Sequence, residues 1–86
     1  MRGPTRLDIR GYVCPLTYVK TKLALGRLAC GERLEVWLRE GEPLQNVPRS
    51  AAEDGHRVVT MEPLPTEGPD TWRLVLVKGA QPRDLL

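Results

Sequence analysis

The sequence TRLDIRGYVCPL, residues 5–16, contains a change from a strand pattern to the start of a helix, and this change is the main signal for the fold. Apolar and polar side chains alternate over residues 5–10, so that Leu7 and Ile9 share one face while polar side chains occupy the other. A period of two is typical of a strand with one buried face. Gly11 interrupts the alternation, and the sequence therefore predicts a strand that ends at this glycine.

A helix is predicted directly after this strand. Cys14-Pro15 opens a stretch of helical period that continues to about Ala29. Proline is favoured at the first position of a helix because its missing N–H would be unpaired there in any case. Cys30-Gly31 follows the last periodic residue, and glycine at that point is a typical stop signal. The first cysteine is therefore expected at the junction between a strand end and a helix start.

The predicted helix carries apolar side chains on two faces, and one sheet can cover only one of them. The first face is formed by Tyr18, Thr21, Leu25 and Leu28. The second, on roughly the opposite side, is formed by Leu16, Val19 and Leu23. The simpler expectation is that neighbouring loops shield the second face. The alternative is a docking surface beside Cys14, because exposed apolar patches often mark partner sites.

The remaining sequence predicts three more strands and a second helix. Strands are expected over residues 32–38, 56–61 and 72–77. The last is nearly continuous in apolar character, which favours a central position in the sheet. Residues 41–43 are expected to form a turn, and residues 44–54 are expected to form a second turn that leads into a short helix. Asn46 is the expected cap of this helix, and Pro48 is expected near its first turn.

This order of elements predicts the fold class. Strand, helix, strand, helix, strand, strand is most simply accommodated by an α+β fold, a two-layer α/β sandwich in which two helices cover one face of a four-stranded mixed sheet. The first strand–helix–strand unit should be a right-handed parallel crossover. The 86 residues are expected to form one domain with its core within residues 5–78.

Composition and charge argue against several classes of function. The formal net charge is only +2 and the pI is 8.8, so no direct nucleic-acid binding is expected. One histidine and two separated cysteines cannot furnish a tetrahedral zinc site, so no metal is expected. No apolar stretch approaches the length that crosses a bilayer, and no secretory signal is recognisable. We therefore expect a cytoplasmic protein with free thiols. We also expect a monomer.

Cys14 is the chief candidate for chemistry. The unpaired N–H groups and the dipole of a helix N-terminus stabilise an anion, which lowers the pKa of a cysteine thiol and supplies the thiolate that a nucleophile requires. Arg10, and more distantly Lys20 and Lys22, add positive charge. The alternative is a small, buried and unreactive side chain. Cys30 would lie roughly 24 Å away along the helix, beyond disulfide reach, and is expected to be structural.

Several short motifs follow one another along the chain in a fairly specific order and spacing. The first is Leu7-Asp8-Ile9-Arg10-Gly11 followed by Cys14-Pro15-Leu16. The others are Lys20-Thr21-Lys22, Ala24-Leu25, Gly31-Glu32, Leu34-Glu35-Val36, Val47-Pro48-Arg49, Gly55-His56 and Lys78. Each motif alone is weak, but together they span residues 7–78, and in this order they resemble the TusA/SirA family. The resemblance implies the same two-layer α/β sandwich.

The resemblance also implies a sulfur carrier. The equivalent of Cys14 accepts sulfane sulfur as a persulfide from a cysteine desulfurase or a rhodanese-like donor, and passes it to an acceptor in tRNA thiolation, sulfur oxidation or cofactor biosynthesis. Such a protein is a persulfide relay rather than an independent multi-turnover enzyme. It requires no cofactor, since the sulfur is held covalently as a persulfide on Cys14. Supporting roles are expected for Arg10, Gly11, Pro15, Leu16 and Thr17. Docking roles are expected for Val19, Lys20 and Leu23.

Two positions depart from the family pattern. Thr17 replaces the second proline of the family's Cys-Pro-x-Pro motif, which adds an N–H and a hydroxyl at the helix start and leaves transfer competence open. Asn46 stands where the family commonly has an acidic residue. The alternative function is a non-catalytic regulatory or interaction module that uses the face of Leu16, Val19 and Leu23. RNA binding ranks last, because the chain has few aromatic residues for base stacking.

Overall fold

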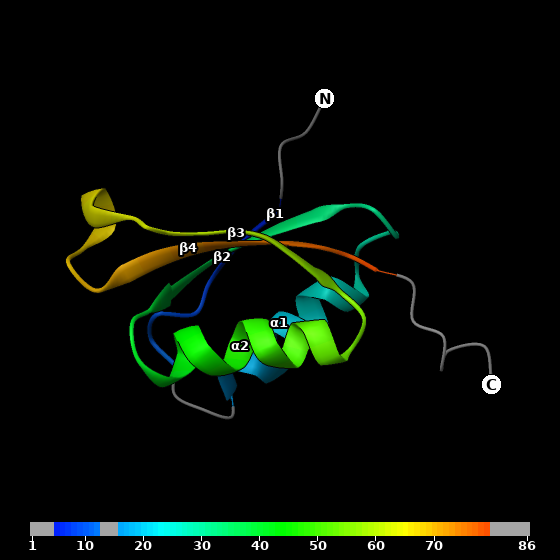
Figure 1. Ribbon diagram of the computed structural model, residues 1–86, viewed down its shortest axis with the longest axis horizontal. Coiled ribbons are helices and arrows are strands. Elements are labelled where there is room, and N and C mark those ends of the chain that lie inside the picture. The colour runs from blue at the N-terminus through cyan, green and yellow to red at the C-terminus, as the bar shows by residue number, and fades with distance from the viewer. Residues whose placement is uncertain (1–4, 13–15, 80–86) are drawn as a thin grey trace.

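The structure is a computed structural model that describes residues 5–12 and 16–79. Within these residues, four strands form one sheet and two α-helices lie against one of its faces, as a two-layer sandwich (Figure 1). The elements in chain order are β1 (Thr5–Asp8), α1 (Leu16–Gly26), β2 (Arg33–Arg39), α2 (Glu42–Glu53), β3 (Arg57–Pro63), the 3-10 helix η1 (Pro65–Glu67) and β4 (Thr71–Val77). The predicted fold class and element order are confirmed.

The strand order in the sheet is β1-β2-β4-β3. β1 pairs with β2 in parallel, with Leu7 opposite Val36, so the chain must cross over through α1 between these two strands. β4 lies between β2 and β3 and is antiparallel to both. The prediction of a central position for the last strand is therefore confirmed, and β1 and β3 are the two edges of the sheet.

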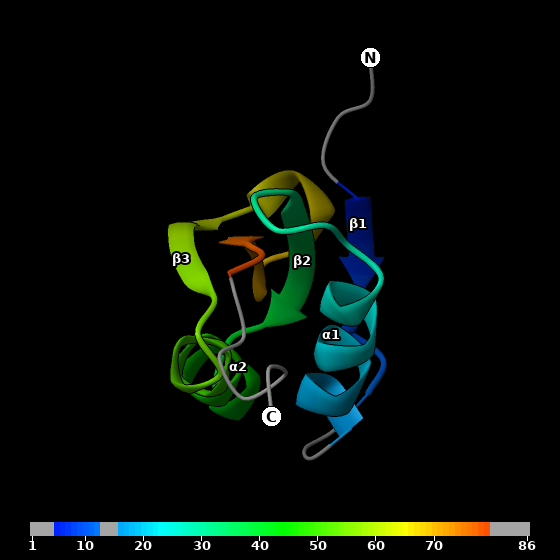
Figure 2. The same cartoon turned by 90° about the vertical axis from the view of Figure 1, so that its right-hand side faces the viewer.

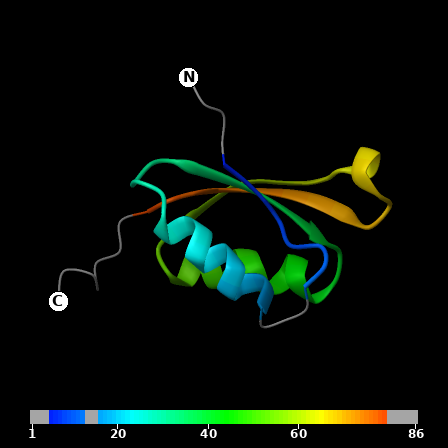
Figure 3. The ribbon, with the colours of Figure 1, turned by 180° about the vertical axis from the view of Figure 1, so that it is seen from behind.

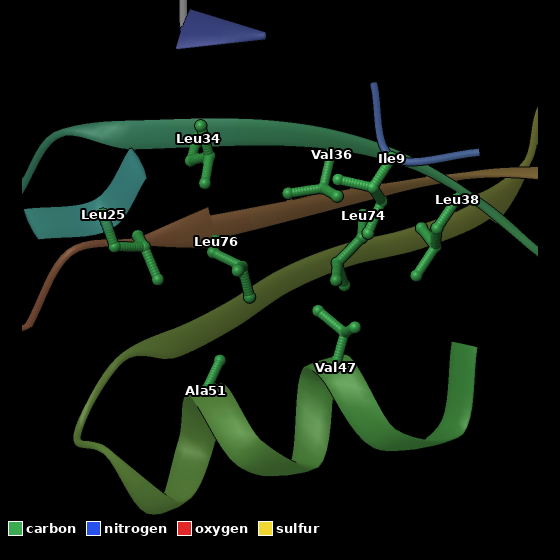
Figure 4. Close-up of a cluster of buried hydrophobic side chains, with 9 residues drawn as sticks. All are labelled: Ile9, Leu25, Leu34, Val36, Leu38, Val47, Ala51, Leu74 and Leu76. Atoms are coloured by element: carbon green, nitrogen blue, oxygen red, sulfur yellow. The ribbon is translucent and has the colours of Figure 1, made fainter. Parts of the chain in front are cut away.

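The core lies between the sheet and the helices (Figure 4). The alternation predicted for β2 is confirmed, because Leu34, Val36 and Leu38 are fully buried. Ile9, Leu25, Val47, Ala51, Leu74 and Leu76 complete the same cluster. Removing one large aliphatic side chain of this kind from water contributes about 1.5–3 kcal/mol to folding. Since the chain has no phenylalanine, these aliphatic residues supply the interior of the sandwich.

The second helix differs from its prediction at its start. α2 begins at Glu42, with Gly41 preceding it at φ 107°, so the expected turn over residues 41–43 is in part the first helical turn. The first-turn proline is Pro43, whose fixed φ suits that position, whereas Pro48 lies inside the helix. Asn46 is not the cap, and its side chain instead accepts a hydrogen bond from Arg49.

Burial explains why the helix continues through its internal proline. Val47 and Ala51, on either side of Pro48 in sequence, are fully buried against the sheet (Figure 4). A proline inside a helix removes one backbone hydrogen bond and costs about 3 kcal/mol. Packing of this apolar face offsets that cost, and local sequence patterns do not contain that information.

The first helix is shorter than its prediction. α1 ends at Gly26 rather than near Ala29. After Gly26 the hydrogen bonds are of the tighter 3-10 type. The Arg27 N–H donates to the Ala24 carbonyl and the Leu28 N–H donates to the Leu25 carbonyl, each three residues back.

Gly79, just after β4, lies against the backbone of Gly55, just before β3. A Cβ atom at position 79 would lie 2.0 Å from the Gly55 carbonyl oxygen. We expect Gly79→Ala to force the two segments apart and to lower the free energy of unfolding by about 1–3 kcal/mol or more. Urea denaturation followed by circular dichroism measures this loss.

Gly26→Ala is the matched control, because a Cβ atom there meets nothing within 4 Å. Alanine at this helical position should leave stability unchanged or raise it by up to about 1 kcal/mol. Equal stability of the two variants would contradict the close approach at Gly79.

Candidate functional site

The candidate site is the junction between β1 and α1. Ile9 extends the β1–β2 pairing, since its N–H donates to the Trp37 carbonyl at 2.9 Å, and its side chain is buried. The Tyr12 N–H then donates to the Ile9 carbonyl at 3.1 Å and closes a turn that contains Gly11. Residues 13–15 follow, so the predicted roles of Cys14 and Pro15 lie outside the described residues. The chain is described again from Leu16, the first residue of α1.

Arg10 anchors the start of this junction. Its guanidinium donates to both Asp8 carboxylate oxygens, at 2.9 and 2.7 Å, and to the Glu67 carbonyl at 2.8 Å. It also lies over the ring of Trp37, with the guanidinium carbon 5.1 Å from the ring centre. The hydrogen bond from Arg10 lowers the pKa of the Asp8 carboxyl. These contacts tie the end of β1 to the end of η1, and a supporting role for Arg10 toward Cys14 stays a prediction.

The side of α1 that packs on the core carries the residues predicted for the first apolar face. Thr21 and Leu25 are fully buried, and Tyr18 and Leu28 are half-buried against the core. Thr17, in the first turn, is fully buried as well, and its carbonyl accepts a hydrogen bond of 2.8 Å from the Thr21 hydroxyl.

The opposite side of α1 is exposed, which corrects one expectation. Leu16, Val19 and Leu23 are 47%, 45% and 60% exposed. The prediction that loops shield these side chains is wrong for the described residues, because α1 packs through its other side and lies at the outside of the helical layer (Figure 2). We call Leu16, Val19, Lys20, Lys22, Leu23 and Arg27 the outer face of α1.

A shallow groove runs along part of this outer face. It has a volume of about 620 Å³ and is lined by Tyr18, Val19, Lys22, Leu23, Gly26 and Arg27. All charged side chains on the outer face are cationic, since α1 contains no Asp or Glu. Lys20 also lies over the ring of Tyr12, 5.0 Å from its centre, next to the junction. The surface thus combines aliphatic contacts with positive charge.

Two contacts between distant parts of the sequence hold α1 in place. The Tyr18 hydroxyl donates to the Asp54 carboxylate at 2.5 Å and ties α1 to the end of α2. Burial of Tyr18, together with this hydrogen bond, raises the pKa of its hydroxyl well above the usual range. The Lys78 ammonium donates to the Leu25 carbonyl at 2.7 Å, where a cation also complements the helix dipole. The sequence contains Lys78 within the family motifs but carries no signal for this contact with α1.

His56 supports the same corner of the molecule. Its side chain is 5% exposed, and its Nδ1 atom accepts a hydrogen bond of 3.1 Å from the Gly79 N–H. Burial, reinforced by the charge of Lys78, lowers the pKa of His56 below its ordinary value of 6.5, while Asp54 acts in the opposite direction. A neutral ring with an unprotonated Nδ1 is the state that this hydrogen bond requires.

Residues 5–12 and 16–79 contain no group of three or more His, Cys, Asp or Glu side chains that could hold a metal ion. In the same part of the chain, no helix has the length and apolar character needed to span a bilayer. Cys30, expected to be structural, is exposed, with a free thiol in the turn that follows α1.

Comparison with solved structures supports the class of fold. The structure resembles that of a SirA-like protein from Desulfitobacterium hafniense, with a TM-score of 0.74 over 88% of this chain and 99% of the other. The two sequences are 22% identical, so this likeness shows the shared two-layer fold alone.

Comparison of sequences establishes the family. The family model described as sulfurtransferase TusA matches residues 5–78, and the chain therefore belongs to the TusA family. A relative from Archaeoglobus fulgidus, named "Putative sulfur carrier protein", is 39% identical over 72 residues, covering 84% of this chain and 78% of that protein. A Thermotoga maritima protein of the same name is 37% identical over 70 residues, covering 81% and 85%. The resemblance drawn from the motifs is confirmed.

The neutral state of His56 makes stability depend on pH. Because its folded pKa is lowered, the unfolded chain binds more protons as the pH falls below about 6.5, and the folded state loses stability there. One such group changes the free energy of unfolding by at most about 1.4 kcal/mol per pH unit. We expect urea midpoints to fall between neutral pH and pH about 5, and His56→Asn to flatten this dependence, since the amide oxygen can still accept from Gly79.

The Asp8 carboxyl, whose pKa is lowered, contributes in a separate window below its ordinary value of 3.8. Asp8→Asn should therefore leave the slope above pH 5 unchanged. An equal slope in wild type and His56→Asn would refute the assignment to His56.

Proposed function

We propose that this chain carries sulfane sulfur as a persulfide on Cys14 and relays it from a donor protein to an acceptor protein. The observation that carries the proposal is the TusA family match over residues 5–78, which includes Cys14. The geometry around this position supports it. Cys14 stands two residues before Leu16, the first described residue of an eleven-residue helix. N–H groups at a helix start favour an anion, whether thiolate or persulfide.

The chemistry proposed is a thiol–persulfide exchange. The Cys14 thiolate attacks the terminal sulfur of the donor persulfide, a new S–S bond forms, the donor's own S–S bond breaks, and the donor leaves as a thiolate. In delivery, a nucleophile of the acceptor attacks the terminal sulfur on Cys14, and the Cys14 thiolate leaves. The sulfur moves at one oxidation level, so neither step requires an external oxidant or reductant.

The outer face of α1 is the proposed docking surface for these proteins. Val19 and Leu23 offer aliphatic contact, and Lys20 and Lys22 offer positive charge. We infer that a donor or acceptor presents an apolar side chain to the groove and carboxylates to the cations around it. Among donors, the resemblance to the family favours a cysteine desulfurase or a rhodanese-like protein, and among acceptors, proteins of tRNA thiolation, sulfur oxidation or cofactor biosynthesis.

Gly11 and Thr17 have proposed supporting roles on either side of Cys14. Gly11 lies exposed in the turn before it, where a small residue leaves room for a partner's backbone. Thr17 replaces the family's second proline and is buried, so its side chain acts through packing of the first turn of α1 rather than through partner contact.

The exposed outer face also favours a second function, a non-catalytic interaction module. Such a module needs the apolar and cationic surface but no sulfur chemistry. The two functions differ in their dependence on Cys14, because the module keeps partner binding and in-cell function in the Cys14→Ser variant.

The first test is intact-mass analysis after incubation with a cysteine desulfurase and free cysteine. We expect wild type and Cys30→Ser to gain one sulfur atom that a thiol reductant removes, and Cys14→Ser to gain none. Cys30→Ser is the control because Cys30 is the other thiol of the chain and is exposed. No gain by well-folded wild type with several desulfurases and rhodanese-like donors would refute the carrier function.

The second test addresses docking. We expect Leu23→Ser and Lys22→Glu each to slow sulfur loading by about tenfold, which corresponds to about 1.4 kcal/mol of lost interaction. Because Leu23 is 60% exposed, its substitution should change folding stability by no more than about 0.5 kcal/mol. Arg33→Glu, the same charge reversal at the exposed start of β2, is the control and should load at the wild-type rate. Equal slowing of sulfur loading by all three variants would contradict docking on the outer face of α1.

A further inference from the structure

β3 is an edge strand with an unusually apolar exposed surface. It pairs with β4 on one side, and in Figure 2 no described element lies beyond it on the other. Val58, Val59 and Met61 are 38%, 45% and 48% exposed. An edge of this kind presents unpaired backbone groups together with apolar side chains and is a template for pairing with another strand.

A bulge in β3 determines which side chains share a face. Val58 lies opposite Leu76, but the next pair joins Thr60 to Val75, so β3 contains one extra residue at this point. Met61 then lies opposite Leu74. Since Leu74 and Leu76 face the helices (Figure 4), Val58 and Met61 share the helical side of the sheet.

The same bulge brings two charges to the other side of the sheet. Arg57 lies opposite Val77, and Glu62 lies opposite Arg73. Both partners in β4 are on the face away from the helices. In a regular strand, residues five positions apart point to opposite faces, so Arg57 and Glu62 share a face because of the extra residue.

These positions make the edge complementary to itself. If two copies of β3 pair antiparallel about a twofold axis, with Arg57 opposite Glu62 of the second copy, then Val58 lies opposite Met61. The apolar pairs fall on the helical side and the ion pairs on the open side, as in the sheet itself. We propose that the edge of β3 associates with β3 of a second copy of this chain in this register, which replaces the expectation of a monomer.

Existing ion pairs leave Glu62 able to take a second partner. The Arg73 guanidinium lies 2.9 Å from Glu62 and 3.4 Å from Glu35, so one cation serves two carboxylates. Arg57 is exposed, and within the described residues it forms no salt bridge. Pairing of the two copies supplies a cation to Glu62 and an anion to Arg57.

The association is expected to be weak, and it leaves the outer face of α1 accessible. A pair of six-residue edges buries less than the roughly 1,200 Å² of a standard stable interface, so the dimer forms at high protein concentration. α1 lies toward the β1 edge, at the opposite side of the molecule from β3 (Figure 2). Both outer faces of α1 therefore stay accessible, and the proposal does not depend on the proposed function.

Sedimentation equilibrium of the full chain over a wide concentration range tests this proposal. The average mass should rise from 9.7 kDa toward twice that value. Arg57→Glu and Glu62→Arg should each weaken association by tenfold or more, because like charges then face each other. An equimolar mixture of the two variants should associate again, because each substituted position then faces a residue of opposite charge. Arg33→Glu, opposite the other side of Val77, is the control and should associate like wild type.

Folding of each variant is checked by circular dichroism. Because Glu62→Arg also removes a partner of Arg73, Glu62→Gln provides a second variant that should weaken association without adding a charge. A mass of 9.7 kDa for wild type at every concentration would overturn the proposal. Association that is insensitive to Arg57→Glu, or a mixture that does not associate, would overturn it as well.

Discussion

Pairing between β2 and β4 is the constraint on which the rest of this structure depends. Seven residues of each strand are in register. The three inward side chains of β2 are fully buried in the centre of the cluster, as are Leu74 and Leu76 of β4, while Trp72 packs against it partly buried. Each edge strand pairs with one of these two strands, and both helices pack on the layer that they form. Since β2 and β4 are more than thirty residues apart in sequence, forming this pair fixes the long-range order of the chain.

Contacts with the core formed on β2 and β4 determine the position of α1. α1 runs beside α2 beneath the sheet (Figure 3). Its buried side packs on the core, Tyr18 joins it to Asp54 at the end of α2, and Lys78 joins its last turn to the end of β4. Because one layer of sheet can cover one side of a helix, the opposite side stays exposed together with its cations. A rigidly held helix with an open apolar and cationic face, directly after Cys14, suits a protein that meets more than one partner.

Both edges of the sheet have consequences for interaction. At the β1 edge, Arg10 holds the turn that precedes position 14 through its contacts with Asp8, with the ring of Trp37 and with η1. At the β3 edge, a single bulge changes which side chains share a face. The two edges lie on opposite sides of the molecule, so the proposed sulfur transfer near α1 and the proposed association through β3 use separate surfaces.

From the sequence alone we obtained the fold class, the four strands in their order along the chain, the central position of β4 and the family. Alternation in β2, the apolar run of β4 and the glycines between elements are local signals, because side-chain period and turn chemistry depend on near neighbours. Contacts within the tertiary structure explain why α2 continues through Pro48, since burial of Val47 and Ala51 outweighs the local cost of proline. The tertiary structure also decided the exposure of the outer face of α1, the partners of Arg10 and the burial of His56. Each of these features depends on contacts between residues far apart in the chain. A local sequence pattern does not indicate which distant segment will cover a given side chain.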